Sequence, residues 1–189
     1  MLQWDSKHAL VSSAQRDNLQ AQFRNCQGFV DFLHGNGINI ADIGSGNGLP
    51  AVVIAVHHPR HRLTLIEANN KKAAFLQTIR QHLKISITVL AQRIEKGLPK
   101  EIQLLTAKAF ASLESFMRVV SPLTTHSMLL AKGIEAHAEM NDLKRTWTFT
   151  TLELIPDETG SFLVWARGSN RATQQKHYDH TAADRRWPS

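Results

Sequence analysis

A glycine-rich segment carries the clearest chemical signal in the sequence. Residues 42–48 read Asp-Ile-Gly-Ser-Gly-Asn-Gly, between a strand-like stretch at residues 38–43 and a helix expected over residues 49–56. Glycines at such a turn tolerate positive φ and let backbone N–H groups approach a ligand closely. The spacing is Gly-x-Gly-x-Gly, and no Lys-Ser or Lys-Thr follows as a P-loop requires. A ligand loop is therefore predicted; the alternative is a glycine turn that only packs a strand against a helix.

Two acidic residues indicate what such a ligand would carry. Asp42 stands two positions before the first glycine, where a carboxylate repels a pyrophosphate but can hold an ammonium group. Glu67 ends a second strand-like stretch, 21 positions after Gly46. In doubly wound α/β folds, an acidic residue about 20 positions beyond the glycines accepts hydrogen bonds from ribose hydroxyls. Glu67 alone would be an ordinary solvated residue, but together with the loop it predicts a nucleoside ligand with a cationic arm.

A second group of candidate residues follows the fourth and fifth strand-like stretches. Ligands of parallel α/β sheets bind at the carboxyl ends of the strands, where Lys108 and Phe110 are expected. Lys108 could contact a base or a phosphate, and Phe110 could stack on a base. The alternative for Phe110 is a place in the core. Lys132 is a second candidate cation at this rim, whereas Cys26, the only cysteine, precedes the sheet and is expected to be a small packing residue.

The elements that must position these residues alternate between strand and helix character. Strands are expected at residues 38–43, 62–67, 85–90, 102–106 and 127–131. Helices are expected at residues 49–56, 70–82 and 133–143, and a further one contains Leu113, Phe116, Met117 and Val120. This α/β alternation predicts a parallel sheet with right-handed crossovers. Residues 146–155 and 162–166, joined by a short turn, predict an antiparallel hairpin that completes a seven-stranded, mostly parallel sheet.

The length of 189 residues suits one domain with appendages. We expect a short helical N-terminal extension at residues 1–36, with a helix break near Gly28, then the ligand-binding domain at residues 37–167 and a basic tail at residues 168–189. No run of about 18 apolar residues is present, so no membrane span is expected. The charged N-terminus does not suit a signal peptide, and the lone cysteine excludes an intrachain disulfide and any zinc site built on several cysteines. We expect a cytoplasmic protein without a metal; a monomer is favoured, but the sequence does not predict the oligomeric state.

The positive charge is unevenly distributed. The net charge is +6, but residues 57–100 carry nine basic residues against two acidic ones, and residues 167–189 carry five against two. The central basic residues could form an RNA-facing stripe or could simply solvate two surfaces; they include Arg60, Arg62, Lys71, Lys72, Arg80 and Lys84. A second candidate RNA contact comprises Arg167, Arg171, Arg185 and Arg186. For His57, His58 and His61 an exposed polar loop is expected rather than a metal site.

Three short motifs resemble those of one enzyme family. Residues 44–50 read Gly-Ser-Gly-Asn-Gly-Leu-Pro, residues 109–113 read Ala-Phe-Ala-Ser-Leu, and residues 131–133 read Ala-Lys-Gly. With these motifs the chain resembles the RsmG (GidB) family, over roughly residues 38–167. The resemblance implies a Rossmann-like class I methyltransferase fold and S-adenosylmethionine (S-adenosyl-L-methionine) as cofactor. It also implies methylation of N7 of a guanine in 16S ribosomal RNA, with ribosomal RNA or the small ribosomal subunit as partner.

The resemblance also assigns site residues. The methionine part of the cofactor would lie against Asp42, Gly44, Gly46 and Gly48, with Ser45 and Leu49 as further contacts of the same loop. Glu67 would hold the ribose, with Ala68 beside it, and the adenine would be framed by Gln92, Arg93 and Ile94. Lys108 stands where the family usually has Arg, and it is expected to contact the cofactor as well as to position the substrate together with Phe110.

Departures from the family pattern leave other functions in view. The family has an Arg-His pair followed by Asp-Ser in its N-terminal part, where this chain has Ala21-Gln22 and Asn25-Cys26. One alternative is a divergent methyltransferase that acts on another RNA site or on a small molecule. Another is a non-catalytic RNA- or ribosome-binding descendant. The absence of a catalytic base does not exclude methylation of guanine N7. The N7 atom carries a free lone pair, and positioning alone can accelerate the transfer.

Overall fold

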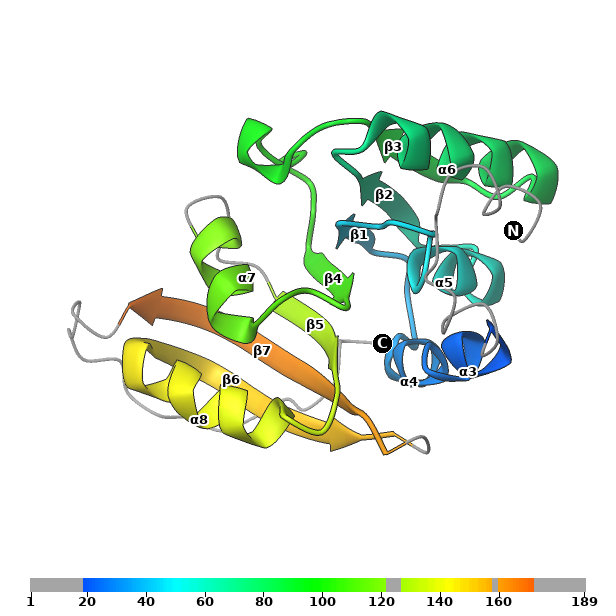
Figure 1. Ribbon diagram of the computed structural model, residues 1–189. Coiled ribbons are helices and arrows are strands. Elements are labelled where there is room, and N and C mark those ends of the chain that lie inside the picture. The colour runs from blue at the N-terminus through cyan, green and yellow to red at the C-terminus, as the bar shows by residue number, and fades with distance from the viewer. Residues whose placement is uncertain (1–18, 122–126, 158–159, 172–189) are drawn as a thin grey trace.

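The protein is described here by a computed structural model that defines residues 19–121, 127–157 and 160–171. One seven-stranded sheet, in the order β3-β2-β1-β4-β5-β7-β6, runs through the molecule (Figure 1). Its strands are β1 Asn39–Ile43, β2 Arg62–Ile66, β3 Ile87–Leu90, β4 Leu104–Lys108, β5 Ser127–Lys132, β6 Trp147–Pro156 and β7 Phe162–Arg171. The first five strands are parallel, and β7 is antiparallel to both β5 and β6. The predicted α/β fold with a closing hairpin is confirmed.

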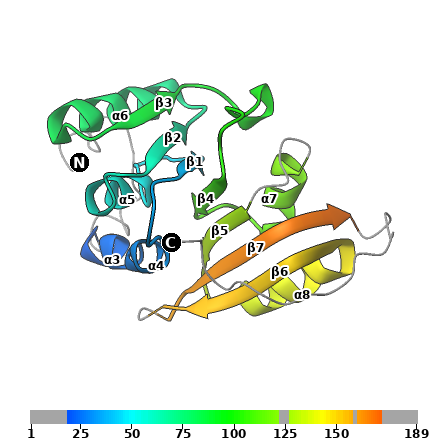
Figure 2. The same cartoon turned by 180° about the vertical axis from the view of Figure 1, so that it is seen from behind.

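Helices cover both faces of the sheet (Figures 1 and 2). They are α3 Leu19–Arg24, α4 Gln27–Phe32, α5 Ala51–His57, α6 Asn70–Leu83, the short 3₁₀ helix η1 Ile94–Lys96, α7 Leu113–Val120 and α8 Ala136–Thr146. Alternate residues of the strands point to opposite faces, so the core divides into two layers. Phe29, Ile54 and Leu76 pack on the side of α4, α5 and α6. Phe116 and Leu143 pack on the side of α7 and α8.

Alternation along β1 and β4 determines which face the candidate polar residues occupy. Ile40 and Leu104 belong to the core layer beneath α4 and α5, and the two residues are register partners. Asp42 and Thr106, two positions further along each strand, are also partners and therefore share that face. Lys108 follows by the same alternation. The three polar side chains thus lie toward the N-terminal helices, at the carboxyl ends of two central strands.

Several boundaries differ from the sequence prediction. β4 begins at Leu104 rather than at residue 102, so Lys108 ends the strand instead of following it. β7 continues to Arg171 and pairs there with Trp147, so its last residues lie beyond the expected start of the tail at residue 168. The N-terminal helix breaks between α3 and α4, before Gly28. Residues 1–18 of the predicted extension and residues 172–189 of the tail lie outside the described residues. None of the helices in the described ranges is long and apolar enough to cross a membrane.

Candidate active site

The predicted ligand residues meet at one edge of the sheet. Parallel strands end at the same edge, so the glycine loop after β1, Glu67 after β2 and Gln92 after β3 become neighbours. Lys108 ends β4 and Lys132 ends β5 at this edge as well. β7 begins there with Phe162, the register partner of Lys132. The structure therefore brings together the glycine loop, the acidic residue and the rim cations that the sequence placed on separate elements.

The glycine loop has the backbone conformation that its composition predicts. Gly44, Gly46 and Gly48 have positive φ values of 68°, 54° and 92°. A Cβ on Gly48 would come within 2.8 Å of Val52 Cγ2, whereas a Cβ on Gly44 would meet nothing within 4 Å. The backbone N–H groups of Gly44 and Ser45 both donate to the carbonyl of Ile66, at 2.9 and 3.2 Å. The loop is thus tied to the end of β2, and its Gly44 side leaves room for a ligand.

Glu67 connects this loop to the start of α6. Glu67 is only 8% exposed. Oε2 accepts the N–H of Gly46 at 2.9 Å, and Oε1 accepts the N–H of Asn69 at 2.7 Å. Asn69 in turn caps α6 by accepting the N–H groups of Lys71 and Lys72. The alternative of a merely solvated Glu67 is wrong, and each carboxylate oxygen retains acceptor capacity for a ribose hydroxyl.

Asp42 lies fully buried at the end of β1. Its Oδ1 accepts a hydrogen bond from Thr106 Oγ1 at 2.8 Å, and its Oδ2 has no hydrogen-bond partner among the described residues. Burial raises the pKa of this carboxyl to about 7, although the hydroxyls of Ser45 and Thr106 act in the opposite direction. An unsatisfied buried acceptor costs about 1–3 kcal/mol. The site therefore lacks one donor, and an ammonium group such as that of S-adenosylmethionine fits this need.

The residues expected to frame an adenine lie beside Glu67. The N–H of Glu67 and the N–H of Gln92 both donate to the carbonyl of Leu90, at 3.1 and 3.0 Å. The Gln92 side chain donates to the Gly97 carbonyl at 3.2 Å and closes the turn around η1. Ile94 is buried, whereas Arg93 and Ala68 are exposed. Ile94 can thus provide an apolar contact for a base, and Arg93 stands at the outer rim.

Lys108 contacts the N-terminal helices. Its ammonium donates to the Gln22 side-chain oxygen on α3, and burial lowers the pKa of Lys108. Cys26 is fully buried beside it, and its Sγ donates to the Gln22 carbonyl at 3.2 Å. Burial raises the pKa of the Cys26 thiol to about 12, so the thiol stays neutral and packs as predicted. The residue type of Gln22 predicts no role; its position, where the family carries Arg-His, is the signal that could have pointed to it.

Two predicted rim residues are less accessible than expected. The ring of Phe110 packs edge-on against Phe116, with centroids 5.1 Å apart, and joins the core beneath α7. The alternative of a core role for Phe110 is therefore the better description of its ring. Lys132 forms an ion pair with Glu139 at 2.8 Å, and its side chain is only 9% exposed. Lys132 does lie at the predicted edge, at the end of β5, but a neighbouring helix supplies its counter-ion and little of the side chain faces solvent.

The central basic residues do not form one stripe. Lys71 and Lys72 open α6 next to Glu67, at the edge of the candidate site. Arg62 begins β2 and Lys84 caps the far end of α6, so both lie at the opposite edge of the sheet. Arg60 precedes β2 and Arg80 lies in the last turn of α6. Of the second basic group, Arg167 is exposed on β7, and Arg185 and Arg186 lie outside the described residues.

The histidines of the loop after α5 have structural roles. His61 is buried rather than exposed as expected: its Nδ1 accepts the N–H of Ile38 at 3.1 Å, and its Nε2 lies 3.4 Å from the carbonyl of Leu33. The ring of His58 bonds to the carbonyl of Val30 at 2.9 Å. These contacts join α4 to the α5–β2 loop. Within the described ranges, no three His, Cys, Asp or Glu side chains are grouped so as to hold a metal ion.

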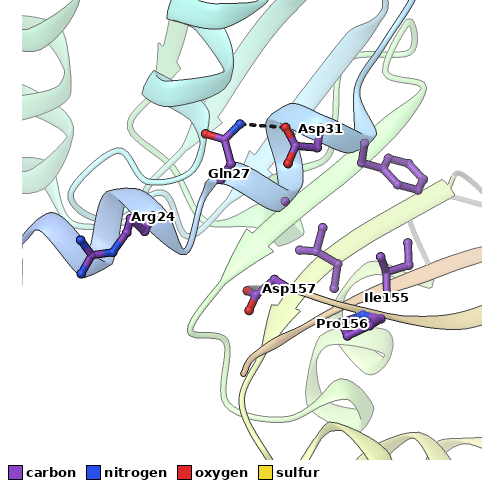
Figure 3. A pocket seen from close by; sticks show the side chains of 9 residues that line it. Arg24, Gln27, Asp31, Ile155, Pro156 and Asp157 are labelled. Atoms are coloured by element: carbon purple, nitrogen blue, oxygen red, sulfur yellow. Dashed lines mark hydrogen bonds between the residues drawn. The ribbon is translucent and has the colours of Figure 1, made fainter. Parts of the chain in front are cut away.

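A cavity of about 680 Å³ lies between the N-terminal helices and the β6–β7 hairpin (Figure 3). Arg24, Asp31 and Phe32 line one side, and Pro156 and Asp157 line the other. Gln27 donates to Asp31 across one turn of α4 at 2.7 Å, as the dashed line shows. The cavity lies near the end of β5, because Pro156 pairs with Phe162 and Phe162 pairs with Lys132, but none of the residues predicted to hold the cofactor lines it. Its volume lies in the range of small-molecule and cofactor pockets.

Comparison with known sequences identifies a family. The family model for GidB, described as rRNA small subunit methyltransferase G, matches residues 1–158. Ribosomal RNA small subunit methyltransferase G of Acidiphilium cryptum is 35% identical over 167 residues, which cover 84% of this chain and 75% of the relative. The protein of the same name from Gluconobacter oxydans is 32% identical over 163 residues, covering 84% of this chain and 82% of the relative.

Comparison with solved structures gives the same fold. Magnesium protoporphyrin IX methyltransferase (ChlM) from Synechocystis PCC 6803, with bound SAM, superposes with a TM-score of 0.63 at 13% identity, over 84% of this chain and 85% of that one. TrmK of M. capricolum, in complex with S-adenosyl-homocysteine, gives a TM-score of 0.56 at 15% identity, over 85% and 71% of the two chains. These comparisons confirm the class I methyltransferase fold. The loop, the orphaned Asp42 oxygen and the sequence relatives agree, and the chain belongs to the GidB family of rRNA small subunit methyltransferases, which are S-adenosylmethionine-dependent enzymes.

Proposed function

We propose that this protein transfers a methyl group from S-adenosylmethionine to N7 of a guanine in 16S ribosomal RNA, in the cytoplasm. The observation that carries the proposal is the buried Asp42 carboxylate, whose Oδ2 lacks a donor, beside a glycine loop tied to Glu67. Such a pair suits a ligand with an ammonium at one end and ribose hydroxyls at the other. Membership of the GidB family supplies the class of substrate.

Different residues at the carboxyl ends of the strands would bind different parts of the cofactor. Asp42 would hold the ammonium, Glu67 the ribose hydroxyls, and Gln92 and Ile94 would flank the base. S-adenosylmethionine, when bound, supplies an electrophilic methyl group. The protein has to hold this group in line with an RNA acceptor and exclude water, and it needs no nucleophile of its own. Cys26 is buried with a raised pKa, which argues against a covalent role for its thiol.

Lys108 is the residue best placed to select guanine. N7 and O6 of guanine are neighbouring acceptors, and a lysine can donate to them, whereas adenine carries an amino group at the corresponding position. The Lys108 ammonium lies at the carboxyl end of β4, where it is held by the Gln22 side chain. A donor aimed at O6 would orient the base while leaving the N7 lone pair available for the methyl group.

Exposed cations at the same edge suit the RNA backbone. Arg24 borders the cavity beside α4, Lys71 stands at the start of α6, and Arg93 follows β3. Each side chain is exposed, so each can exchange solvent for a phosphate. Arg60, Arg62 and Lys84 are exposed as well but lie at the opposite edge of the sheet. We therefore place the RNA across the strand ends, with a nucleotide entering toward the cavity.

Transfer of a labelled methyl group tests the proposal. The protein is incubated with labelled S-adenosylmethionine and either naked 16S RNA or small subunits from cells that lack the modification, and the product is mapped. Label at guanine N7 is the expected result. A product at another atom or in another RNA would reject the proposed target, and failure to bind the cofactor in calorimetry would reject the enzymatic function itself.

A further inference from the structure

An ion pair lies directly behind the segment that joins β4 to α7. Lys132, the last residue of β5, and Glu139, in the first turn of α8, are 2.8 Å apart between Nζ and Oε1. The two side chains are only 9% and 22% exposed. Two largely desolvated charges are costly unless they satisfy further groups. Their surroundings therefore indicate what this pair does.

Both members of the pair contact the backbone of residues 109–113. Lys132 Nζ lies 3.4 Å from the carbonyl oxygens of Phe110 and Ala111. The other oxygen of Glu139, Oε2, accepts the N–H of Leu113, the first residue of α7, at 2.7 Å. One ion pair thus serves two carbonyls and one amide of the same short segment. The segment is held from β5 and α8, elements that follow it in the chain.

The segment itself needs to be held. Ala109 has a φ of 59°, in the left-handed region that residues with a Cβ rarely adopt. Such a conformation persists only where the surroundings impose it. Ser112 adds a local restraint, because its side chain accepts the N–H of Ser115 at 3.1 Å. The strained residue stands directly between Lys108 and Phe110, so the direction of both side chains depends on this segment.

A second ion pair on α8 provides a contrast. Arg145 and Asp142 are 3.3 Å apart, and their side chains are 79% and 71% exposed. Exposed pairs of this kind contribute little to stability. The Lys132–Glu139 pair differs in its burial and in its contacts with the 109–113 backbone. A purely electrostatic surface role does not explain those contacts.

We propose that Lys132 and Glu139 are positioning residues that fix the 109–113 segment, so that Lys108 meets the RNA base in one orientation. The inference rests on the proposed function, since it takes the strand edge to be the place where RNA reacts. It assigns Lys132 to the protein's own backbone rather than to an RNA phosphate. Glu139, a residue without an evident role in the sequence, becomes an equal partner.

The test compares K132M, E139A and their double variant with D142A as the matched control on α8. Positioning predicts that both single variants lower kcat for RNA methylation by about ten- to a hundredfold, as small misplacements do. The cofactor Kd stays within about twofold, and the double variant is no worse than the singles, because the two residues act as a unit. E139Q, which keeps an acceptor for the Leu113 N–H, recovers part of the loss. D142A behaves as the parent protein.

Two other hypotheses predict different results, and either of these results would overturn the proposal. If Lys132 bound an RNA phosphate, K132M would raise KM and lower the salt dependence of binding, while E139A would leave both parameters unchanged. If the pair were only structural, the variants would unfold at lower temperature but retain kcat well below that temperature.

A measurement without RNA separates this inference from the proposed function. Hydrogen exchange of the Leu113 amide should accelerate at least tenfold in E139A relative to D142A. Unchanged exchange in that comparison refutes the positioning role even if the parent protein methylates RNA. If exchange of the Leu113 amide accelerates in E139A but the parent protein does not methylate RNA, the proposed function is refuted. The result would still support the role of the ion pair in fixing the 109–113 segment.

Discussion

Glu67 Oε2 accepts a hydrogen bond from the backbone N–H of Gly46 at 2.9 Å, across 21 positions of the chain. The bond makes the acidic residue part of the glycine loop, and the second oxygen extends the connection to the start of α6. One carboxylate therefore orders the loop and offers acceptors to a ligand.

Replacing Glu67 by Ala should weaken cofactor binding by about 1–3 kcal/mol, because charged acceptors for two hydroxyls and the restraint on Gly46 are lost together. Calorimetric titration with S-adenosylmethionine measures the change. E95A is the matched control, since Glu95 is an exposed carboxylate on η1 at the same edge. Equal affinities of E67A and E95A would contradict the assigned role.

Cofactor affinity should depend on pH through Asp42. Burial raises the pKa of Asp42 to about 7 in the free protein, so the carboxyl becomes protonated as the pH falls through that value. Binding an ammonium requires the ionised form, and affinity should therefore decrease from pH 7.5 to 6, approaching tenfold per pH unit below the pKa. D42N should bind more weakly at pH 7.5 and lose this slope. A parallel slope in D42N would show that another group is responsible.

Lys108 should matter more for RNA than neighbouring cations. K108M removes the donor proposed for guanine O6 and should lower kcat/KM by about ten- to a hundredfold, which corresponds to the ~1–3 kcal/mol of one base contact. K108R, which carries the residue usual in the family, should retain most of the activity. The control is K100M, because Lys100 is exposed before β4. If K108M and K100M had equal activity, Lys108 would have no role in recognising the substrate.

The position of the RNA can be tested by charge. Neutralising Arg24, Lys71 and Arg93 with glutamine should weaken RNA binding and reduce the slope of log K against log salt by about 2–3, since each lost phosphate contact is worth roughly 0.7–0.9. The same number of changes at Arg60, Arg62 and Lys84, on the opposite edge, should leave the slope unchanged. RNA binding measured between about 50 and 200 mM salt distinguishes the two sets of variants. A reduced slope only in the variant of Arg60, Arg62 and Lys84 would place the RNA at the opposite edge of the sheet.

Stability should decrease in mild acid because of His61. Burial lowers the pKa of His61 in the folded state, and its Nδ1 must stay unprotonated to accept the Ile38 N–H. The unfolded chain, with a histidine pKa near 6.5, then binds more protons, so the stability contribution is present above about pH 6.5 and is lost as the pH falls through the lower folded pKa. Urea unfolding at several pH values measures this. H61Q should show a flatter profile than H57Q, whose parent residue is exposed; identical profiles would contradict the assignment.

Much of the site could be predicted from local spacing. The loop at residues 42–48 stands between a strand and a helix, and Glu67 ends the next strand, so the handedness of the crossover brings them together without further information. The motif around Lys108 follows the same rule. The sequence predicts that β4 starts at residue 102, and the strand starts at Leu104. This difference of two residues still leaves Lys108 at the carboxyl end of the strand, because apolar residues precede it in both cases.

The sequence by itself determined that the sheet is mostly parallel, and it determined the glycine loop and the acidic residue that faces it, because strand–helix alternation and short motif spacing act locally. The order of the strands within the sheet came from the tertiary structure. The tertiary structure alone decided which charges are satisfied. Glu139 reaches Lys132 from α8, and His61 is buried by α4, although neither contact leaves a mark in local sequence. Helix α6 likewise carries Lys71 and Lys84 to opposite edges of the sheet. Burial and ion pairing depend on elements that come into contact only after the chain has folded. These tertiary contacts decide whether a cation is free to bind RNA or is bound to the protein's own backbone.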